Sequence, residues 1–294
     1  MRHLTHACAI GALHRGKQVE QFLGDIQDED QHGIRWISLT PSSEGIGIYL
    51  HEVQDIGTDA FWDITEFPPP DPDEEDFGEA AIVPTPAEAL EHGERDFGAD
   101  PAKWVNQGIA CSEYLDHRTA RADRLQQHEV ILSLGIVPGR ERAGSPEDAV
   151  LAHFGTTDGR KLGLDLLRDA IQRRDGVDVE MALIVSFTFG FTTDHLTPLL
   201  HLAKADWHYK HEDVVSALGT LRTANAAEAL FFSTQWVPNY LDFDECRALA
   251  TKAIWALGNT PGPEAEQALA RLSESDNKIL RETARTVRER RRTP

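Results

Sequence analysis

The segment from Asp206 to Asp213 carries the densest cluster of side chains that could do chemistry. His208 and His211 stand three positions apart, and Glu212 follows directly. Imidazole and carboxylate groups at this spacing on a helix can share a metal ion. One interpretation is therefore a metal site with His208, His211 and Glu212 as weak candidate ligands. The alternative, which we favour, is that an acidic residue caps a helix while the histidines line a surface, with no metal bound.

No other catalytic pattern stands out in the chain. The three cysteines, Cys8, Cys111 and Cys246, are far apart, which is typical of reduced cytoplasmic thiols and not of a disulfide framework. There is no nucleophile elbow and no glycine-rich loop that would cradle phosphates. We therefore expect a cytoplasmic protein that is not an enzyme, with no catalytic residues and no cofactor.

The charge of the chain is strongly negative and unevenly distributed. Acidic residues outnumber basic ones 49 to 29, giving a net charge of −20 over 294 residues. Residues 1–144 account for −16 of it, and 15 acidic residues but no Lys or Arg lie between Arg35 and Arg95. A polyanionic chain repels nucleic acid and favours a cationic partner. We expect a basic protein partner, no direct nucleic-acid binding and no membrane association, since the longest apolar run is about half a bilayer span.

The first half of the chain is expected to be a mixed β/α domain over residues 1–144. Residues 33–39 have the composition of a strand, and apolar and polar residues alternate over 46–53, which predicts two strands joined as a hairpin. A third strand is expected over 60–64, before the three consecutive prolines that begin at Pro68. Helices are expected over 86–92, with proline in the first turn, and over 120–135.

The second half is expected to be an all-helical domain over residues 145–294. Ser145 followed by Pro146 and two acidic residues is a helix start signal. Apolar periodicity then predicts helices joined by short loops, over 162–173, 179–189, 194–203, 212–221, 226–232, 245–257, 263–273 and 278–290.

Internal repetition is the strongest pattern in the chain. The run Ala217-Leu218-Gly219 recurs 39 positions later as Ala256-Leu257-Gly258, and the same offset aligns the alanines and leucines of the next helix without a gap. Each unit is expected to be a helix that ends at glycine, a turn, and a second helix that packs back. A single pair cannot bury its apolar face, so the pairs must stack.

This repeat resembles a HEAT-like repeat of the type found in phycobilisome lyases, over roughly residues 146–292. The resemblance implies an α+β protein in which the mixed domain precedes an α-helical HEAT-like solenoid. HEAT-type di-iron hydroxylases place His-Glu pairs on successive repeats, and His211-Glu212 is similar to one pair. The equivalent positions of the next repeat are Ala250 and Thr251, so the chain departs from that pattern.

Two segments are the expected partner-binding surfaces. The first is an acidic loop that would steer a basic partner, and the second is a long link between helices whose aromatic residues would anchor it. The expected contact residues are Asp71, Asp73, Glu74, Glu75, Asp76, Trp236, Tyr240, Asp242 and Asp244. The alternative for Trp236 and Tyr240 is local packing beneath the link.

The overall arrangement, an acidic β-containing module ahead of short HEAT-like repeats, loosely resembles bacterial polymorphic-toxin immunity proteins. That resemblance implies an antitoxin-like protein that binds and occludes a basic toxin domain. A generic HEAT-repeat adaptor with another client shares every one of these sequence features. A metal-dependent HEAT-type enzyme that uses the histidine cluster is the third alternative.

Overall fold

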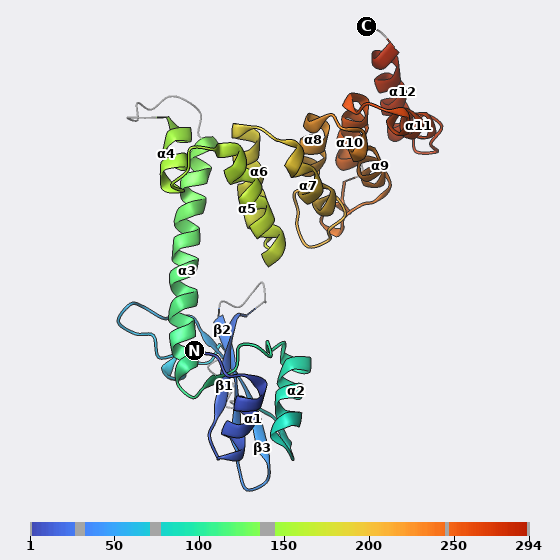
Figure 1. Ribbon diagram of the computed structural model, residues 1–294. Helices are drawn as coiled ribbons and strands as arrows, with labels where there is room; N and C mark the ends of the chain where they lie inside the picture. The colour runs from blue at the N-terminus through green and yellow to red at the C-terminus, as the bar shows by residue number, and fades with distance from the viewer. Residues whose placement is uncertain (1, 27–32, 71–77, 136–144, 245–246, 293–294) are drawn as a thin grey trace. The chain divides into compact units, whose positions relative to one another are not determined.

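The chain folds into two compact units. The computed structural model describes residues 2–26, 33–70, 78–135, 145–244 and 247–292 (Figure 1). The units are Met1–Arg124, called here the sheet unit, and Leu125–Pro294, the helical unit. An antiparallel sheet followed by helices makes the chain an α+β protein, as expected. The division lies within helix α3 (Ile109–Leu132), whereas the predicted boundary lies between residues 144 and 145.

The sheet unit contains a five-stranded sheet in the order β4-β3-β2-β1-β5, with every pairing antiparallel. Its elements are α1 (His6–His14), β1 (Val19–Asp25), β2 (Gly33–Pro41), β3 (Ile46–Gln54), β4 (Glu79–Val83), α2 (Pro86–Phe97), β5 (Val105–Asn106) and the first part of α3. The expected hairpin is confirmed, because β2 and β3 pair from Pro41↔Ile46 to Gly33↔Gln54.

The two faces of the sheet pack against different elements, because successive side chains of a strand point to opposite faces. Ile37 and Leu39 of β2 face α1 and α2, and they are fully buried in a core that also contains Leu90 and Trp104. Figure 1 shows α1 and α2 against the sheet. The opposite face packs at one end on the start of α3, through residues that include Tyr114, and on the 61–67 segment. Polar side chains on this face include Ser38 and Thr40 of β2 and His51 of β3.

The expected strand over 60–64 is wrong. Thr58 and Phe61 form an isolated bridge, and a 3-10 helix, η1 (Ile64–Glu66), follows. The physical reason is Asp63, whose side chain accepts the backbone N–H of Thr65 at 3.1 Å and so starts a helical turn. The strand that pairs with β3 on this side is β4, which was not predicted. Strand β1 was not predicted either.

The helical unit contains the helices that apolar periodicity predicted, with ends that differ by a few residues. They are α4 (Pro146–His153), α5 (Gly159–Arg173), α6 (Gly176–Phe189), α7 (Leu196–Leu202), α8 (His211–Leu221), α9 (Ala227–Gln235), α10 (Ala248–Asn259), α11 (Pro263–Leu272) and α12 (Lys278–Arg292). The predicted start signal is confirmed, because the Ser145 hydroxyl accepts the N–H of Asp148 at 3.1 Å. Within the described ranges, no helix combines the length and apolarity needed to cross a bilayer.

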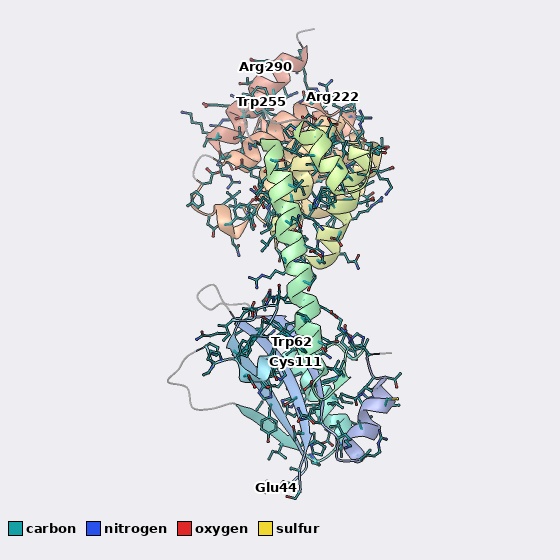
Figure 2. All side chains as sticks on the ribbon, turned by 90° about the vertical axis from the view of Figure 1, so that its left-hand side faces the viewer. Glu44, Trp62, Cys111, Arg222, Trp255 and Arg290 are labelled. Atoms are coloured by element: carbon teal, nitrogen blue, oxygen red, sulfur yellow. The ribbon has the colours of Figure 1, made fainter. Side chains whose placement is uncertain are left out.

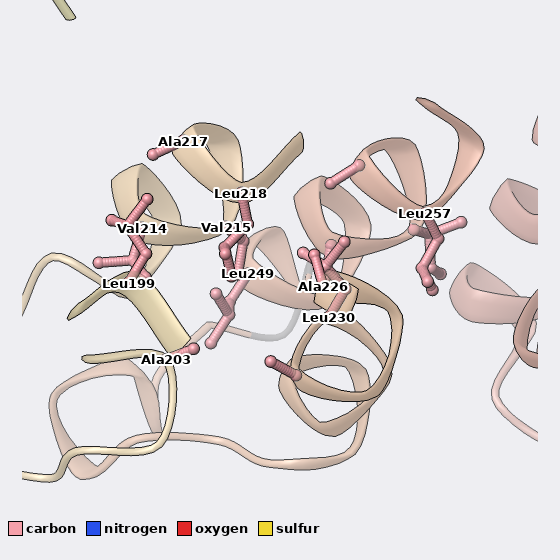
Figure 3. Packing of buried hydrophobic residues seen from close by; sticks show 14 of the residues in the cluster. Leu199, Ala203, Val214, Val215, Ala217, Leu218, Ala226, Leu230, Leu249 and Leu257 are labelled. Carbon is pink, nitrogen blue, oxygen red and sulfur yellow. The ribbon is translucent and has the colours of Figure 1, made fainter. Parts of the chain in front are cut away.

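One apolar core runs through the helices from α5 to α12. Helix α8 packs against α10, α10 against α12, and α9 against α11. Figure 3 shows Val215 and Leu218 of α8 gathered with Leu249 of α10. Because α8, α10 and α12 pack on one another in turn and α9 packs on α11, their buried leucine and alanine side chains belong to one cluster.

The repeated glycines mark close approaches between these helices. A Cβ on Gly219 of α8 would lie 2.9 Å from the Cβ of Ala256 on α10. A Cβ on Gly258, its equivalent in the repeat, would lie 2.5 Å from Cγ1 of Val287 on α12. Both glycines lie inside their helices, so the expectation that each helix ends at glycine is wrong. Their role is to let neighbouring helices pack at short range.

Helix α8 ends instead at Arg222, which adopts the left-handed conformation with φ 49° and ψ 43° (labelled in Figure 2). A side chain in this region carries a steric penalty that glycine avoids. We expect Arg222→Gly to raise the free energy of unfolding by about 0.5–1 kcal/mol, after allowing for the greater freedom of glycine in the unfolded chain. Urea denaturation monitored by circular dichroism measures it. Arg222→Ala removes the same side chain without relieving the backbone, so an equal gain from alanine would contradict this explanation.

Candidate functional site

The sheet unit has an open cavity of about 890 Å³ on the face of the sheet that α1 and α2 do not cover. Its floor is formed by β1, β2 and β3, and its walls by segments 60–65 and 107–111. Concave sites of this size that combine apolar walls with a few polar groups are typical binding sites. The lining residues are Gln18, Glu20, Trp36, Ser38, Thr40, Tyr49, His51, Val53, Ala60, Phe61, Trp62, Asp63, Ile64, Thr65, Gln107, Gly108, Ala110 and Cys111.

A column of aromatic rings crosses the floor of the cavity. The rings of Trp36 and His51 stack with centroids 4.5 Å apart and planes 12° apart, and Tyr49 lies beyond His51 with centroids 6.4 Å apart. These residues meet because Trp36 is opposite His51 in the register of β2 with β3. The hydroxyl of Ser38 lies 2.9 Å from Nε2 of His51. Burial lowers the pKa of His51, so the imidazole is neutral at pH 7 and adds no positive charge to the cavity.

Glu20 is a buried carboxylate at the end of the cavity where α3 begins. Glu20 is only 5% exposed, and its Oε1 accepts the N–H of Ala110 at 3.0 Å. The backbone N–H groups at the start of a helix lack partners within the helix. At the start of α3 the carboxylate of Glu20, from β1, accepts one of them, a role that a residue next to the helix usually performs. Burial raises the pKa of Glu20, and these hydrogen bonds oppose the rise.

Asp63, from segment 60–65, and Cys111, from segment 107–111, both line the cavity and are in contact. Asp63 accepts hydrogen bonds from the hydroxyl and the N–H of Thr65, and these lower the pKa of Asp63, so the carboxylate is ionised at pH 7. The Sγ of Cys111 lies 3.6 Å from Oδ1 of Asp63, and burial raises the pKa of the thiol. Cys111 is therefore held as a neutral thiol and not as a nucleophilic thiolate.

The composition of the lining indicates which ligands the cavity can bind. It includes two carboxylates and the aromatic residues Trp36, Tyr49, Phe61 and Trp62, but neither lysine nor arginine. Trp62 is 39% exposed, and Figure 2 labels it beside Cys111 in the sheet unit. Aromatic faces and carboxylates both attract cations. The cavity is therefore suited to a positively charged group.

The predicted histidine cluster lies in the helical unit and is held by hydrogen bonds. His208 and His211 are 2% and 1% exposed, and their rings stack with centroids 4.0 Å apart. Nε2 of His208 lies 2.8 Å from the carbonyl of Leu202, and Nε2 of His211 lies 2.7 Å from that of Ala205. A carbonyl only accepts, so both imidazoles donate through Nε2.

The remaining nitrogens of the two rings also have partners. Nδ1 of His208 accepts the N–H of Lys210, and Nδ1 of His211 lies 3.0 Å from the hydroxyl of Tyr240. Glu212, the third weak metal candidate, forms an ion pair with Lys252 at 2.6 Å. Among the described residues, no three His, Cys, Asp or Glu side chains are grouped so that they could hold a metal ion.

The structure describes only some of the expected partner-binding residues. Asp71, Asp73, Glu74, Glu75 and Asp76 lie outside the described residues. The predicted aromatic anchors and acidic residues of the link are placed by the structure, and they belong to the helical unit.

In the link, Trp236 and Tyr240 are half-buried and pack on His211. The ring centroids of Trp236 and His211 are 4.9 Å apart, and those of Tyr240 and His211 are 5.6 Å apart. Asp244 accepts the N–H of Ala248 at 2.5 Å at the start of α10, and Asp242 is exposed. The structure thus ties the two aromatic side chains to the histidine cluster and places Asp244 at a helix start.

The cavity in the sheet unit was not predicted from the sequence. Alternation over β2 and β3 already indicated that Trp36 and His51 share a face, because residues two apart in a strand point the same way. One wall of the cavity was missed because segment 60–64 was predicted as a strand. Glu20 was missed because β1 was not predicted.

Comparison with protein-family models, with curated proteins and with solved structures finds no significant match to this chain.

Proposed function

We propose that this protein is a non-enzymatic interaction protein that binds a basic partner, and that the cavity of the sheet unit is part of its binding surface. The observation that carries the proposal is the lining of the cavity, where aromatic side chains stand with Glu20 and Asp63 and without a lysine or arginine. The absence of lysine and arginine between Arg35 and Arg95 also favours a positively charged partner. Complementary charge speeds association and excludes acidic competitors.

The helical unit is proposed to be a short HEAT-like array that presents a second surface to the same partner. This rests on the 39-residue repeat and on the alternate packing of α8 with α10 and of α10 with α12. The close approaches at Gly219 and Gly258 support it, because these equivalent glycines of the repeat each face the helix two positions along the chain. Stacked helix pairs of this kind leave extended surfaces available for binding.

An antitoxin-like immunity protein is the narrower form of this proposal, and a HEAT-repeat adaptor is the alternative. The two differ only in the partner. A pull-down with the tagged chain from native lysate at low salt, eluted by a salt step and identified by mass spectrometry, separates them. A stoichiometric basic partner with a toxin domain supports an immunity protein, and another basic partner supports an adaptor. Recovery of no basic partner would reject the proposal.

Charge reversal in the acidic loop tests the steering role predicted for it. Replacing Asp73, Glu74 and Glu75 together with lysine is expected to slow association with the recovered partner about tenfold at low salt. It should also flatten the dependence of the on-rate on ionic strength, because exposed charges are screened over a Debye length of about 8 Å in physiological salt. Surface plasmon resonance over a salt series measures both. An on-rate and a salt slope equal to those of the wild type would remove the loop from the mechanism.

A further inference from the structure

The cavity in the sheet unit has the features of a site for one flat cation. Tyr49 and Phe61 are half-buried and Trp62 is exposed, so aromatic faces border the opening. Asp63, ionised because its pKa is lowered, adds a negative charge on one wall. Acceptor oxygens on the floor come from the side chains of Gln18 and Thr40, which lie 3.3 Å apart.

We propose that this cavity binds the guanidinium group of an arginine side chain on the basic partner, an inference that rests on the proposed function. A guanidinium is planar, stacks on aromatic faces, and offers five N–H donors to acceptors around its edge. The ammonium of lysine is compact and more strongly hydrated, so it loses more hydration free energy than a guanidinium when it leaves water. Asp63 would pair with the guanidinium while Trp62 stacks on it, and the floor would receive its remaining donors.

The chain itself contains arginines that make the same kind of contact. Arg290 lies over the ring of Trp255 at 4.6 Å, and Arg271 lies over Phe231 at the same distance. Figure 2 labels Arg290 and Trp255 close together in the helical unit. A third arginine, Arg174, lies 6.0 Å from the ring of Trp207. Guanidinium groups of this chain therefore lie against aromatic rings, as expected for a flat and weakly hydrated cation.

Three capped tripeptides provide the test: Gly-Arg-Gly, Gly-citrulline-Gly and Gly-Lys-Gly. Citrulline has the shape of arginine without its charge, so it isolates the electrostatic part of binding. Isothermal titration calorimetry with the full chain at low salt and pH 7.5 is expected to give a Kd on the order of 1 mM for the arginine peptide. Citrulline and lysine should each bind at least about fivefold more weakly.

Two substitutions assign the binding to the cavity. Asp63→Asn keeps a side-chain oxygen to accept the N–H of Thr65 and removes only the charge, so it should weaken arginine binding about fivefold. Glu66→Gln is the matched control, because Glu66 is an exposed residue of η1 and is not among the lining residues. It should leave the affinity unchanged. Thermal unfolding of both variants confirms that they fold.

A second readout locates the peptide directly. In a Cys8→Ser, Cys246→Ser variant the remaining thiol is Cys111, which lines the cavity. Bound arginine peptide should slow its alkylation by iodoacetamide in proportion to occupancy. Unchanged alkylation, equal binding of citrulline or lysine, or no arginine binding would each overturn the proposal. If the arginine peptide fails while the pull-down still recovers a basic partner, the proposed function stands and the arginine site is rejected.

Discussion

Gly57→Ala is expected to lower the free energy of unfolding of the sheet unit by about 2–4 kcal/mol. A Cβ at this position would lie 1.8 Å from the hydroxyl oxygen of Tyr114, well inside any permitted contact. Tyr114 cannot move away easily. It is fully buried, its ring packs edge-to-face on Phe67, and its hydroxyl donates to Oδ1 of Asp55 at 2.5 Å. Either the ring shifts and this hydrogen bond is lost, or the backbone at residue 57 moves.

Urea denaturation followed by tryptophan fluorescence measures this loss. The matched control is Gly11→Ala in α1, where a Cβ would meet only the flexible end of Arg15, at 3.1 Å. That change should be neutral or stabilise by up to about 1 kcal/mol, since alanine favours helix. In a Tyr114→Phe background, Gly57→Ala should be less damaging, because the nearest clashing atom is gone. Equal stability of the Gly57 and Gly11 variants would show that the chain at residue 57 adapts freely.

Acidification from pH 7 to pH 5 is expected to cost the helical unit about 2 kcal/mol of stability through His211. Burial, and then the neighbouring His208, lower the pKa of His211 to about 4, against about 6.5 in an unfolded chain. Between these values the unfolded chain binds a proton that the folded chain does not. Stability is therefore complete above the unfolded pKa and is lost as the pH falls toward 4. Burial lowers the pKa of His208 as well, which adds a loss in the same direction.

The charged groups around the histidine pair do not reverse this direction. His201 disfavours the protonated form of His208, and the ion pairs Glu180–Lys210 and Glu212–Lys252 balance their own charges. Protonation would also convert Nδ1 of His211 from an acceptor into a donor facing the Tyr240 hydroxyl, which already accepts the N–H of His211 at 3.2 Å.

Urea denaturation at a series of pH values, with proton NMR of the imidazoles, measures the effect. His211→Gln should flatten the pH dependence between pH 7 and 5 while lowering stability at pH 7. His153→Gln, at an exposed histidine of α4, is the control and should leave the slope unchanged. A His211 resonance that titrates near pH 6.5 in the folded protein would contradict the prediction.

Apolar periodicity was sufficient to predict the helical unit because its helices have one buried stripe each. The repeat also pointed to Gly219 and Gly258, but their role depends on Ala256 and Val287 of neighbouring helices, which no local pattern reveals. Sequence spacing placed the glycines near helix ends, where a capping role is common. The contacts show that packing between helices requires them.

The sheet was only partly predictable because two segments of the chain carry misleading side chains. In β1, Glu20 and Gln21 are polar yet buried, since Glu20 caps α3 and Gln21 makes two hydrogen bonds with the backbone of Asp100. These partners lie far away in the sequence, so a local pattern cannot reveal them. Over 60–64, aromatic and β-branched residues suggested a strand, but Asp63 begins a helical turn there. The same two segments form part of the cavity, which is why the candidate site was missed.

The short strand β5 has a consequence for the order in which the sheet unit folds. Strands β1 to β4 follow one another along the chain with each neighbour paired, so their contacts close loops of modest length. Val105 of β5, however, pairs with Glu20, which lies 85 residues earlier in the chain. Loop closure over that distance has the larger entropic cost, and long-range contacts slow folding. The four-stranded meander can therefore form first, and the docking of Trp104 and the start of α3 completes the unit, so the cavity is assembled in the last step.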